Sequence, residues 1–170
     1  MPKLSLSTAD QLRFAEGTFN VFHSTPESVE AFTTNPLPGV FGMRRSEIDE
    51  AVVLEPGQLP GIHLNGINIS LDEELLVDAP GGRVNVVDSR LDVGTDEVGG
   101  RISITGEAIN VDGGTELIAN GRSGGGLIEV GGSWQNSDAS VRQAVTAQVE
   151  HGALLDASAS VDGDGGEIVV

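Results

Sequence analysis

The chain has 170 residues, enough for about one domain, and 38% of them are hydrophobic but only 4% aromatic. Its nine basic residues are outnumbered by 26 acidic ones, and the resulting charge of -17 would repel the phosphates of nucleic acids and of anionic lipids. The lack of cysteine excludes disulfides, thiolate chemistry and cysteine-bound zinc. No apolar run is long enough to cross a membrane as a helix, so we expect neither nucleic-acid binding nor membrane insertion.

Residues 1–58 differ in composition from the rest of the chain. They include all five phenylalanines, five of the seven prolines and the basic pair Arg44 and Arg45. We interpret this segment as an irregular, aromatic-rich cap, because a stack of repeats needs its open end covered. The first residues lack the apolar region and cleavage site of a signal peptide, so an exported protein would contain this chain as an internal or processed piece.

Residues 59–170 contain an internal repeat in which a double glycine precedes a short alternating strand. The repeat occurs at 81–86, 99–104, 125–130 and 165–170. The second glycine of each pair is Gly82, Gly100, Gly126 or Gly166, at steps of 18, 26 and 40 residues. This spacing predicts coils of roughly 20 to 25 residues with a glycine at the same corner of each coil.

Alternation within these strands predicts one inward row of aliphatic side chains per coil. The predicted interior residues are Val84, Val86, Ile102, Ile104, Ile128, Val130, Ile168 and Val170. Further short strands are expected at 62–71, 75–77, 91–93, 108–111, 116–119, 145–149 and 153–156. One coil cannot bury its apolar side alone, so we expect the coils to stack at about 4.8 Å into an all-β parallel β-helix, or β-solenoid.

One stretch is ambiguous between helix and strand. Val141, Val145 and Val149 have helical spacing after Asp138, which could cap a helix. We favour a strand, because residues 145–150 alternate cleanly and a long helix would interrupt the stack. The sequence stops within the strand predicted at 167–170, from which we expect that the native polypeptide continues.

Two sets of segments resemble a known family. Residues 25–42, with Asn35, Pro36 and Gly39, resemble the Asn-Pro-containing motif in the secretion domain of filamentous-haemagglutinin-like exoproteins exported by two-partner secretion. Segments 79–84, 125–135, 152–159 and 165–170 resemble the repeats of cyanobacterial and proteobacterial members. The resemblance implies a right-handed single-stranded parallel β-helix, export through an outer-membrane secretion pore, and a secreted or cell-surface protein that acts in adhesion, surface layers or intercellular contact.

The candidate catalytic groups are dispersed. His23, His63 and His151 lie far apart with no motif around them, which is typical of turn and surface histidines. Stacking could align acidic residues on neighbouring coils, as in β-helical enzymes that cleave polysaccharides with paired acids, although a solvated acidic face is the preferred interpretation. The acidic residues in question are Asp88, Asp92 and Asp112, or Glu73 and Glu74. We predict no catalytic and no cofactor-binding residue.

Two further features allow a ligand. Asp162 and Asp164 alternate with glycines, as oxygen ligands of Ca²⁺ can, but their pattern matches neither an EF-hand loop nor a calcium-binding nonapeptide, so a glycine-rich corner is preferred. Trp134, the only tryptophan, could stack on a sugar ring, although we favour a role in covering an adjacent coil.

These observations predict a non-enzymatic, structural and adhesive segment of an exoprotein. Its expected partners are a host or neighbouring-cell surface, or glycans on it. The first alternative is a self-assembling filament or surface-layer component, whose open ends pair with copies of itself. The second is a polysaccharide-acting enzyme built on the same fold.

Overall fold

The computed structural model describes residues 3–8, 11–13, 18–20, 42–44 and 61–170. These residues form strands and a single short 3-10 helix, η1 (Trp134–Asn136). The strands are β1 (Lys3–Ser7), β2 (Gln11–Arg13), β3 (Thr18–Asn20), β4 (Gly42–Arg44), β5 (Gly61–Asn65), β6 (Asn68–Ser70), β7 (Glu74–Val87), β8 (Arg90–Asp92), β9 (Arg101–Val111), β10 (Glu116–Ile118), β11 (Leu127–Val130), β12 (Thr146–Val149), β13 (Leu154–Asp156) and β14 (Glu167–Val169).

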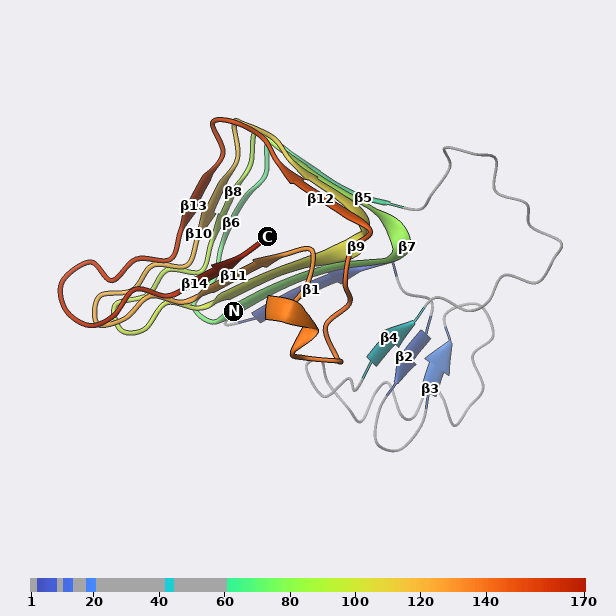
Figure 1. The fold of residues 1–170 in the computed structure, drawn as a ribbon, viewed down its shortest axis with the longest axis horizontal. Helices are drawn as coiled ribbons and strands as arrows, with labels where there is room; N and C mark the ends of the chain where they lie inside the picture. The colour runs from blue at the N-terminus through green and yellow to red at the C-terminus, as the bar shows by residue number, and fades with distance from the viewer. Residues whose placement is uncertain (1–2, 9–10, 14–17, 21–41, 45–60) are drawn as a thin grey trace, which may run out of the picture.

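The largest sheet is seven-stranded and parallel, with the order β1-β7-β9-β11-β14 and with β5 and β12 added beside β7 and β9 (Figure 1). β7 and β9 are long, and the two halves of each pair with different strands. The first half of β9 pairs with β11 and its second half with β12. In the same way, β1 pairs with the first half of β7, and β5 with the second.

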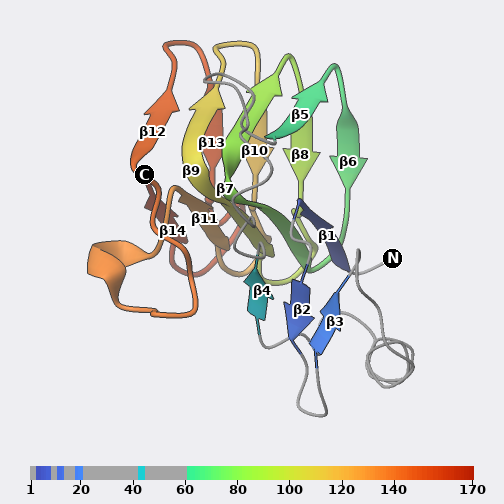
Figure 2. The ribbon, with the colours of Figure 1, turned by 90° about the vertical axis from the view of Figure 1, so that its right-hand side faces the viewer.

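A second parallel sheet has four strands in the order β13-β10-β8-β6. From β6 onward the chain passes back and forth between this sheet and the seven-stranded one, so that strands of successive passes lie side by side (Figure 2). Pairing is in register: Leu91 of β8 lies beside Ile69 of β6 and Leu117 of β10. The turns between the sheets are held by backbone hydrogen bonds and isolated bridges, such as Thr95 to Gly121.

The aliphatic core lies between the two parallel sheets. Strand alternation turns every second side chain inward. The completely buried side chains include Leu75, Ile102 and Ile128 from the larger sheet, and Leu91 and Leu117 from the smaller one. The core is therefore built from Val, Ile, Leu and Ala, as the composition indicates.

The predicted architecture is wrong. A right-handed single-stranded parallel β-helix was expected, but the strands are divided among separate sheets, and neither a closed sheet nor a solenoid sheet is found in the described part of the chain. Alternation and glycine spacing predict which segments are strands and which pass lies beside which. They do not determine where the pairing of strands stops, and here it gives way to turns that bond to one another, as where the Thr95 amide donates to the Asn120 carbonyl at 3.0 Å.

The predicted alignment of the repeats is also wrong in one place. Ile102 pairs with Ile128, and Ile128 with Ile168, but Val84 pairs with Ile109 and Ile62 instead of with Ile102. The partner of Ile102 on β7 is Leu75. Gly81 and Gly82 lie within β7, at a register shift between Ala79 and Arg83, so Gly82 does not share a corner with Gly100, Gly126 and Gly166.

Little of the predicted cap falls within the described residues. β1 belongs to the seven-stranded parallel sheet, where it pairs with β7. β2 pairs with β3 and β4 in a separate antiparallel sheet of three strands. The ambiguous stretch after Asp138 contains the strand β12 at Thr146–Val149, and the alternative helix does not form.

Candidate functional site

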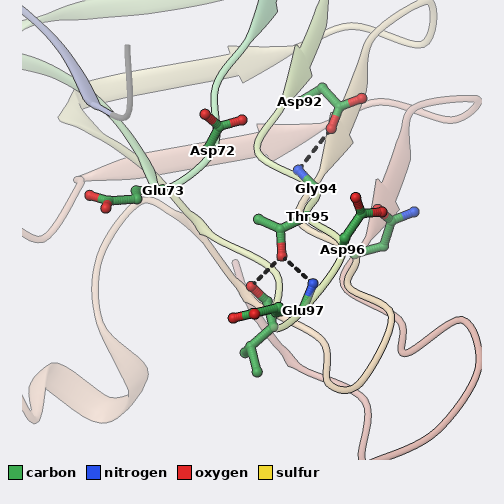
Figure 3. Close-up of a pocket in the computed structure, with 9 residues that line it drawn as sticks. Asp72, Glu73, Asp92, Gly94, Thr95, Asp96 and Glu97 are labelled. Carbon is green, nitrogen blue, oxygen red and sulfur yellow. Dashed lines mark hydrogen bonds between the residues drawn. The ribbon is translucent and has the colours of Figure 1, made fainter.

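An acidic groove lies at the turns that lead from the four-stranded sheet into the seven-stranded one (Figure 3). Asp72 and Glu73 lie between β6 and β7, and Asp92 ends β8. The turn from β8 to β9 adds Gly94, Thr95, Asp96, Glu97 and Val98, and Asn120 follows β10. Successive passes of the chain thus place their acidic turns side by side.

Hydrogen bonds within the turn fix the wall of this acidic groove. The Gly94 amide donates to Oδ1 of Asp92 at 2.8 Å, and the Thr95 hydroxyl donates to the Val98 carbonyl at 2.8 Å. The same hydroxyl accepts the Glu97 amide at 3.0 Å (Figure 3). A Cβ at Gly94 would lie 2.5 Å from Oδ1 of Asn120, so the Asn120 side chain would have to shift to admit a larger residue here.

The groove is electrostatically one-sided. Five carboxylates line it, and none of its described lining residues is Lys or Arg. Arg90 lies beside it, where Nη2 is 2.8 Å from Oδ2 of Asp92 and Nη1 binds Glu116. The hydrogen bond to Asp92 raises the pKa of Arg90 above its ordinary value, so this cation stays charged. The potential of the groove favours cationic groups, although the described residues contain no group of three His, Cys, Asp or Glu side chains that could hold a metal ion.

The acidic residues considered for catalysis are not gathered into one site. Oδ1 of Asp112 accepts hydrogen bonds from the Asp88 amide at 3.1 Å, the Gly114 amide at 3.1 Å and the Thr115 hydroxyl at 2.8 Å. The Thr115 hydrogen bond holds the pKa of Asp112 below its ordinary value. Asp112 therefore stabilises a turn as an ionised acceptor, while Asp92 lies in the acidic groove.

Glu73 and Glu74 are likewise separated in their roles. Glu73 lines the acidic groove. Oε1 of Glu74 is 3.8 Å from Nη1 of Arg101, whose Nη2 is 2.6 Å from Oε2 of the buried Glu129. Arg101 thus links carboxylates from the strands on either side of β9, so Glu74 and Glu129 help to hold β7, β9 and β11 together.

The remaining sequence candidates have separate surroundings. Nδ1 of His63 is 3.1 Å from Nδ2 of Asn85, and His151 is exposed at the turn before β13. Asp162 and Asp164 are both exposed, and Oδ1 of Asp162 accepts the amide of Gly163 at 3.0 Å. His23 and the export-motif residues Asn35, Pro36 and Gly39 lie outside the described residues.

Gly100, Gly126 and Gly166 form a column immediately before β9, β11 and β14. The amide of Leu127 bonds to the carbonyl of Gly100 at 3.0 Å, and that of Glu167 to the carbonyl of Gly126 at 2.9 Å. The equivalent position before β7 is Glu73, because the Arg101 amide donates to its carbonyl at 2.8 Å. We call these three glycines the glycine column.

Trp134 lies on a loop formed by residues 131–145, which we call the Trp134 loop. The loop leaves the seven-stranded sheet after β11 and returns at β12, projecting from the sheets (Figure 1). Its ends are joined by a hydrogen bond from the Ala144 amide to the Gly131 carbonyl at 2.6 Å. Trp134 itself is 59% exposed, so it is not buried under a neighbouring strand.

A buried carboxylate ties the Trp134 loop to the sheet. Oδ1 of Asp78, on β7, accepts the Thr105 hydroxyl of β9 at 2.8 Å and lies 3.4 Å from Nε of Arg142 in the loop. Within the loop, the Ser133 hydroxyl oxygen accepts the Asp138 amide at 3.1 Å and Nε2 of Gln143 at 3.3 Å. These contacts hold the loop at both its base and its tip.

Several residues that line the acidic groove, or a second hollow beside Trp134, were not predicted as site residues. They are Asp72, Asp96 and Glu97 in the acidic groove, and Gln135, Asn136 and Gln143 near Trp134. One signal was available for the groove: an acidic pair at 72–73 and another at 96–97 each come a few residues before a strand of the seven-stranded sheet. The surroundings of Trp134 depend on how the loop folds back, for which the sequence has no periodic signal.

Among the described residues, no helix is both long enough and apolar enough to cross a membrane. Comparison of the chain with family models, with curated proteins and with solved structures gives no match.

Proposed function

We propose that this chain is a structural and adhesive segment of a secreted or cell-surface exoprotein of the filamentous-haemagglutinin-like kind, which attaches its cell to another cell or to a host surface. The observation that supports this best is the parallel pairing of successive passes in both sheets, which is in register apart from the shift between Ala79 and Arg83 of β7. Such pairing presents side chains in fixed rows and supports projecting turns on a rigid base, which suits surface contact more than catalysis.

Composition and surface support the same proposal. An export route through an outer-membrane pore is compatible with a chain without cysteine, because disulfides formed beforehand would obstruct threading. Two of the acidic residues considered for catalysis, Asp112 and Glu74, have structural roles, which favours a non-enzymatic function.

An attachment assay tests the proposal. Fluorescent beads coated with the purified chain are applied to epithelial cells, to a lawn of bacteria and to plates coated with mixed glycans, at physiological salt. We expect retention well above that of beads coated with serum albumin, another acidic protein, on at least one surface. Retention equal to albumin on all three surfaces would contradict adhesion.

Self-assembly is the second candidate, and the outer strands favour it. β14 and β13 end the strand order of their sheets, and Leu154, Ile168 and Val170 are 47%, 44% and 65% exposed. Outer strands with exposed aliphatic side chains can pair with another copy. Sedimentation velocity over a range of concentrations should show growing assemblies if the chain is a filament component, and a constant monomer if it is an adhesin.

The same preparations test the enzyme alternative. Incubation with neutral and acidic polysaccharides, followed by a reducing-end assay, should show no release of new chain ends. Release that is lost in the double variant Asp92→Asn, Asp96→Asn would establish a polysaccharide-cleaving activity in the acidic groove and overturn the non-enzymatic proposal.

A further inference from the structure

A second hollow lies under the Trp134 loop, between that loop, β12 and β14. We call it the Trp134 cleft. Trp134, Gln135, Asn136 and Gln143 line it with an aromatic ring and three amide side chains, and Ser133 adds a hydroxyl. The apolar part of its lining consists of Val130, Ala144, Ala147, Val169 and Val170.

The charge of the cleft is unusual for this molecule. The chain has a formal charge of -17, yet none of the described residues that line the cleft has an ionisable side chain. No lining side chain offers an ion pair to a charged ligand, and the α-carboxylate of Val170, the last residue of the printed sequence, disfavours anions further. Its ligand should therefore be neutral and should present both an apolar face and hydrogen-bonding groups.

The backbone of the cleft is held in a demanding conformation. Gln135 and Asn136 are consecutive non-glycine residues with positive φ, at 49° and 55°. Left-handed backbone is unfavourable for residues with a side chain, and it concentrates at ligand-binding positions. Both residues are exposed and follow Trp134 directly, on a loop anchored through Arg142 and Asp78.

From these observations we infer that the Trp134 cleft binds an uncharged carbohydrate. A pyranose ring has an apolar C–H face that stacks on the exposed indole, and the edge of the ring displays hydroxyls. The amides of Gln135, Asn136 and Gln143 each contain a donor and an acceptor, which matches hydroxyls that act as both. This inference deepens the proposed adhesive function by naming the chemical class of the ligand.

The fluorescence of the chain reports on this cleft directly, because Trp134 is the only tryptophan and there is no tyrosine. Purified chain is titrated with neutral oligosaccharides of glucose, galactose and N-acetylglucosamine, and with the anionic oligosaccharides of heparin and polygalacturonate. We expect a saturable shift of the emission to shorter wavelength with at least one neutral series and none with the anionic ones. The absence of any saturable change, or equal binding of anionic sugars, would overturn the inference.

Matched variants separate the cleft from the rest of the surface. Gln143→Ala should lower the affinity for the neutral oligosaccharide about tenfold, the usual effect of losing one hydrogen bond to a ligand. Because Nε2 of Gln143 also donates to the Ser133 hydroxyl at 3.3 Å, thermal unfolding of this variant is measured alongside and should be unchanged. Gln148→Ala removes an exposed amide of β12 that does not line the cleft, and its affinity should equal that of the unmodified chain. Equal affinity in all three proteins would overturn the assignment of the amides.

Replacement of the aromatic ring is the strictest test. Calorimetry with Trp134→Ala should show no binding, and Trp134→Phe, which keeps an aromatic face, should retain weaker binding. Unchanged thermal unfolding confirms that both variants fold. If beads coated with Trp134→Ala attach to cells as well as beads coated with the unmodified chain, the carbohydrate cleft is overturned and adhesion stands. If the chain binds sugar but its beads attach to no surface, adhesion is overturned and the carbohydrate cleft stands.

Discussion

The backbone of one strand lies directly against the α-carbon of the next at each member of the glycine column. A Cβ on Gly126 would lie 2.0 Å from the carbonyl oxygen of Gly100, and one on Gly166 would lie 1.8 Å from that of Gly126. No side chain can be accommodated at these distances unless the strands separate. At this scale glycine is needed for close approach of backbones, since Gly126 does not have a positive φ.

Gly126→Ala tests this requirement. We expect the substitution to lower the free energy of unfolding by about 1–3 kcal/mol or more, the usual cost of forcing extra atoms into a packed region. Gly165→Ala is the control, because a Cβ there has no atom within 4 Å. Urea unfolding followed by circular dichroism measures both variants, and equal stabilities would show that the strands can shift without cost.

Asp112 gives the second prediction at the scale of the residue. Its pKa is lowered mainly by the Thr115 hydroxyl, from an ordinary value of 3.8, so the unfolded chain binds the proton more readily than the folded chain. The stabilisation is complete above about pH 4 and is lost as the pH falls through the lower, folded pKa.

The Thr115→Val variant should therefore lose less stability than the unmodified protein as the pH falls below about 4, because it lacks the hydroxyl that favours the ionised carboxylate. Thr115→Ser keeps the hydroxyl and should retain the pH dependence. Chemical unfolding at a series of pH values measures the slope. A slope that is the same in Thr115→Val and in the unmodified protein would assign the acid sensitivity to other carboxylates, such as Asp138 and Asp156, whose pKa values are also lowered by hydrogen bonds from Ser140 and Ser158.

At the scale of the element, the strands of the seven-stranded sheet form continuous rows of aliphatic side chains. Leu75, Ile102, Ile128 and Ile168 occupy equivalent positions on β7, β9, β11 and β14. Burial along this row is unequal, since Ile128 is completely buried while Ile168 is 44% exposed. The same residue type in the same row thus has two different environments.

This difference gives a paired prediction. Ile128→Ala should cost about 2–5 kcal/mol of unfolding free energy, because it removes buried methyl groups and leaves a cavity. Ile168→Ala should cost clearly less, as much of its side chain is already in contact with water. Thermal or urea unfolding of the two variants provides the comparison. Equal losses would mean that the outer strand is covered in solution, for example by another copy of the chain.

The elements also show how far prediction from the sequence extends. Period-two alternation and glycine pairs locate β9, β11 and β14 and their mutual register, because each strand has its own local signal. Gly81 and Gly82 have the same local signal, yet they lie inside β7 at a register shift, since pairing along a long strand is decided by its neighbours. The acidic groove and the Trp134 cleft depend on contacts between turns far apart in sequence, so single residues such as Trp134 could be noticed while their surroundings could not.

At the scale of the whole molecule, charge is the dominant property. A formal charge of -17 on 170 residues produces self-repulsion that opposes the folded state. The acidic groove adds to this repulsion, because five carboxylates line it while Arg90, which pairs with Asp92, lies only beside it. Mobile ions screen such repulsion over about 8 Å at physiological ionic strength and over about 30 Å in dilute buffer.

We therefore expect the melting temperature to rise by a few degrees between dilute buffer and physiological sodium chloride. The double variant Asp96→Asn, Glu97→Gln should show a smaller rise, since it removes two exposed charges of the groove. Differential scanning calorimetry at several salt concentrations measures the effect. A melting temperature that falls with salt would indicate that attractive pairs, such as Arg101 with Glu129, outweigh the repulsion.

The closure of the Trp134 loop has a consequence for modification of the protein. The chain leaves the sheet at Gly131 and returns at Val145, and both points are bonded to β9, through the Ile104 and Glu107 carbonyls at 2.9 Å. Because the two ends of the Trp134 loop are both held by β9, the flanking strands do not fix the length of the loop. Foreign peptides inserted at this position would be displayed on a preformed support, which makes the loop a natural grafting point for engineered recognition.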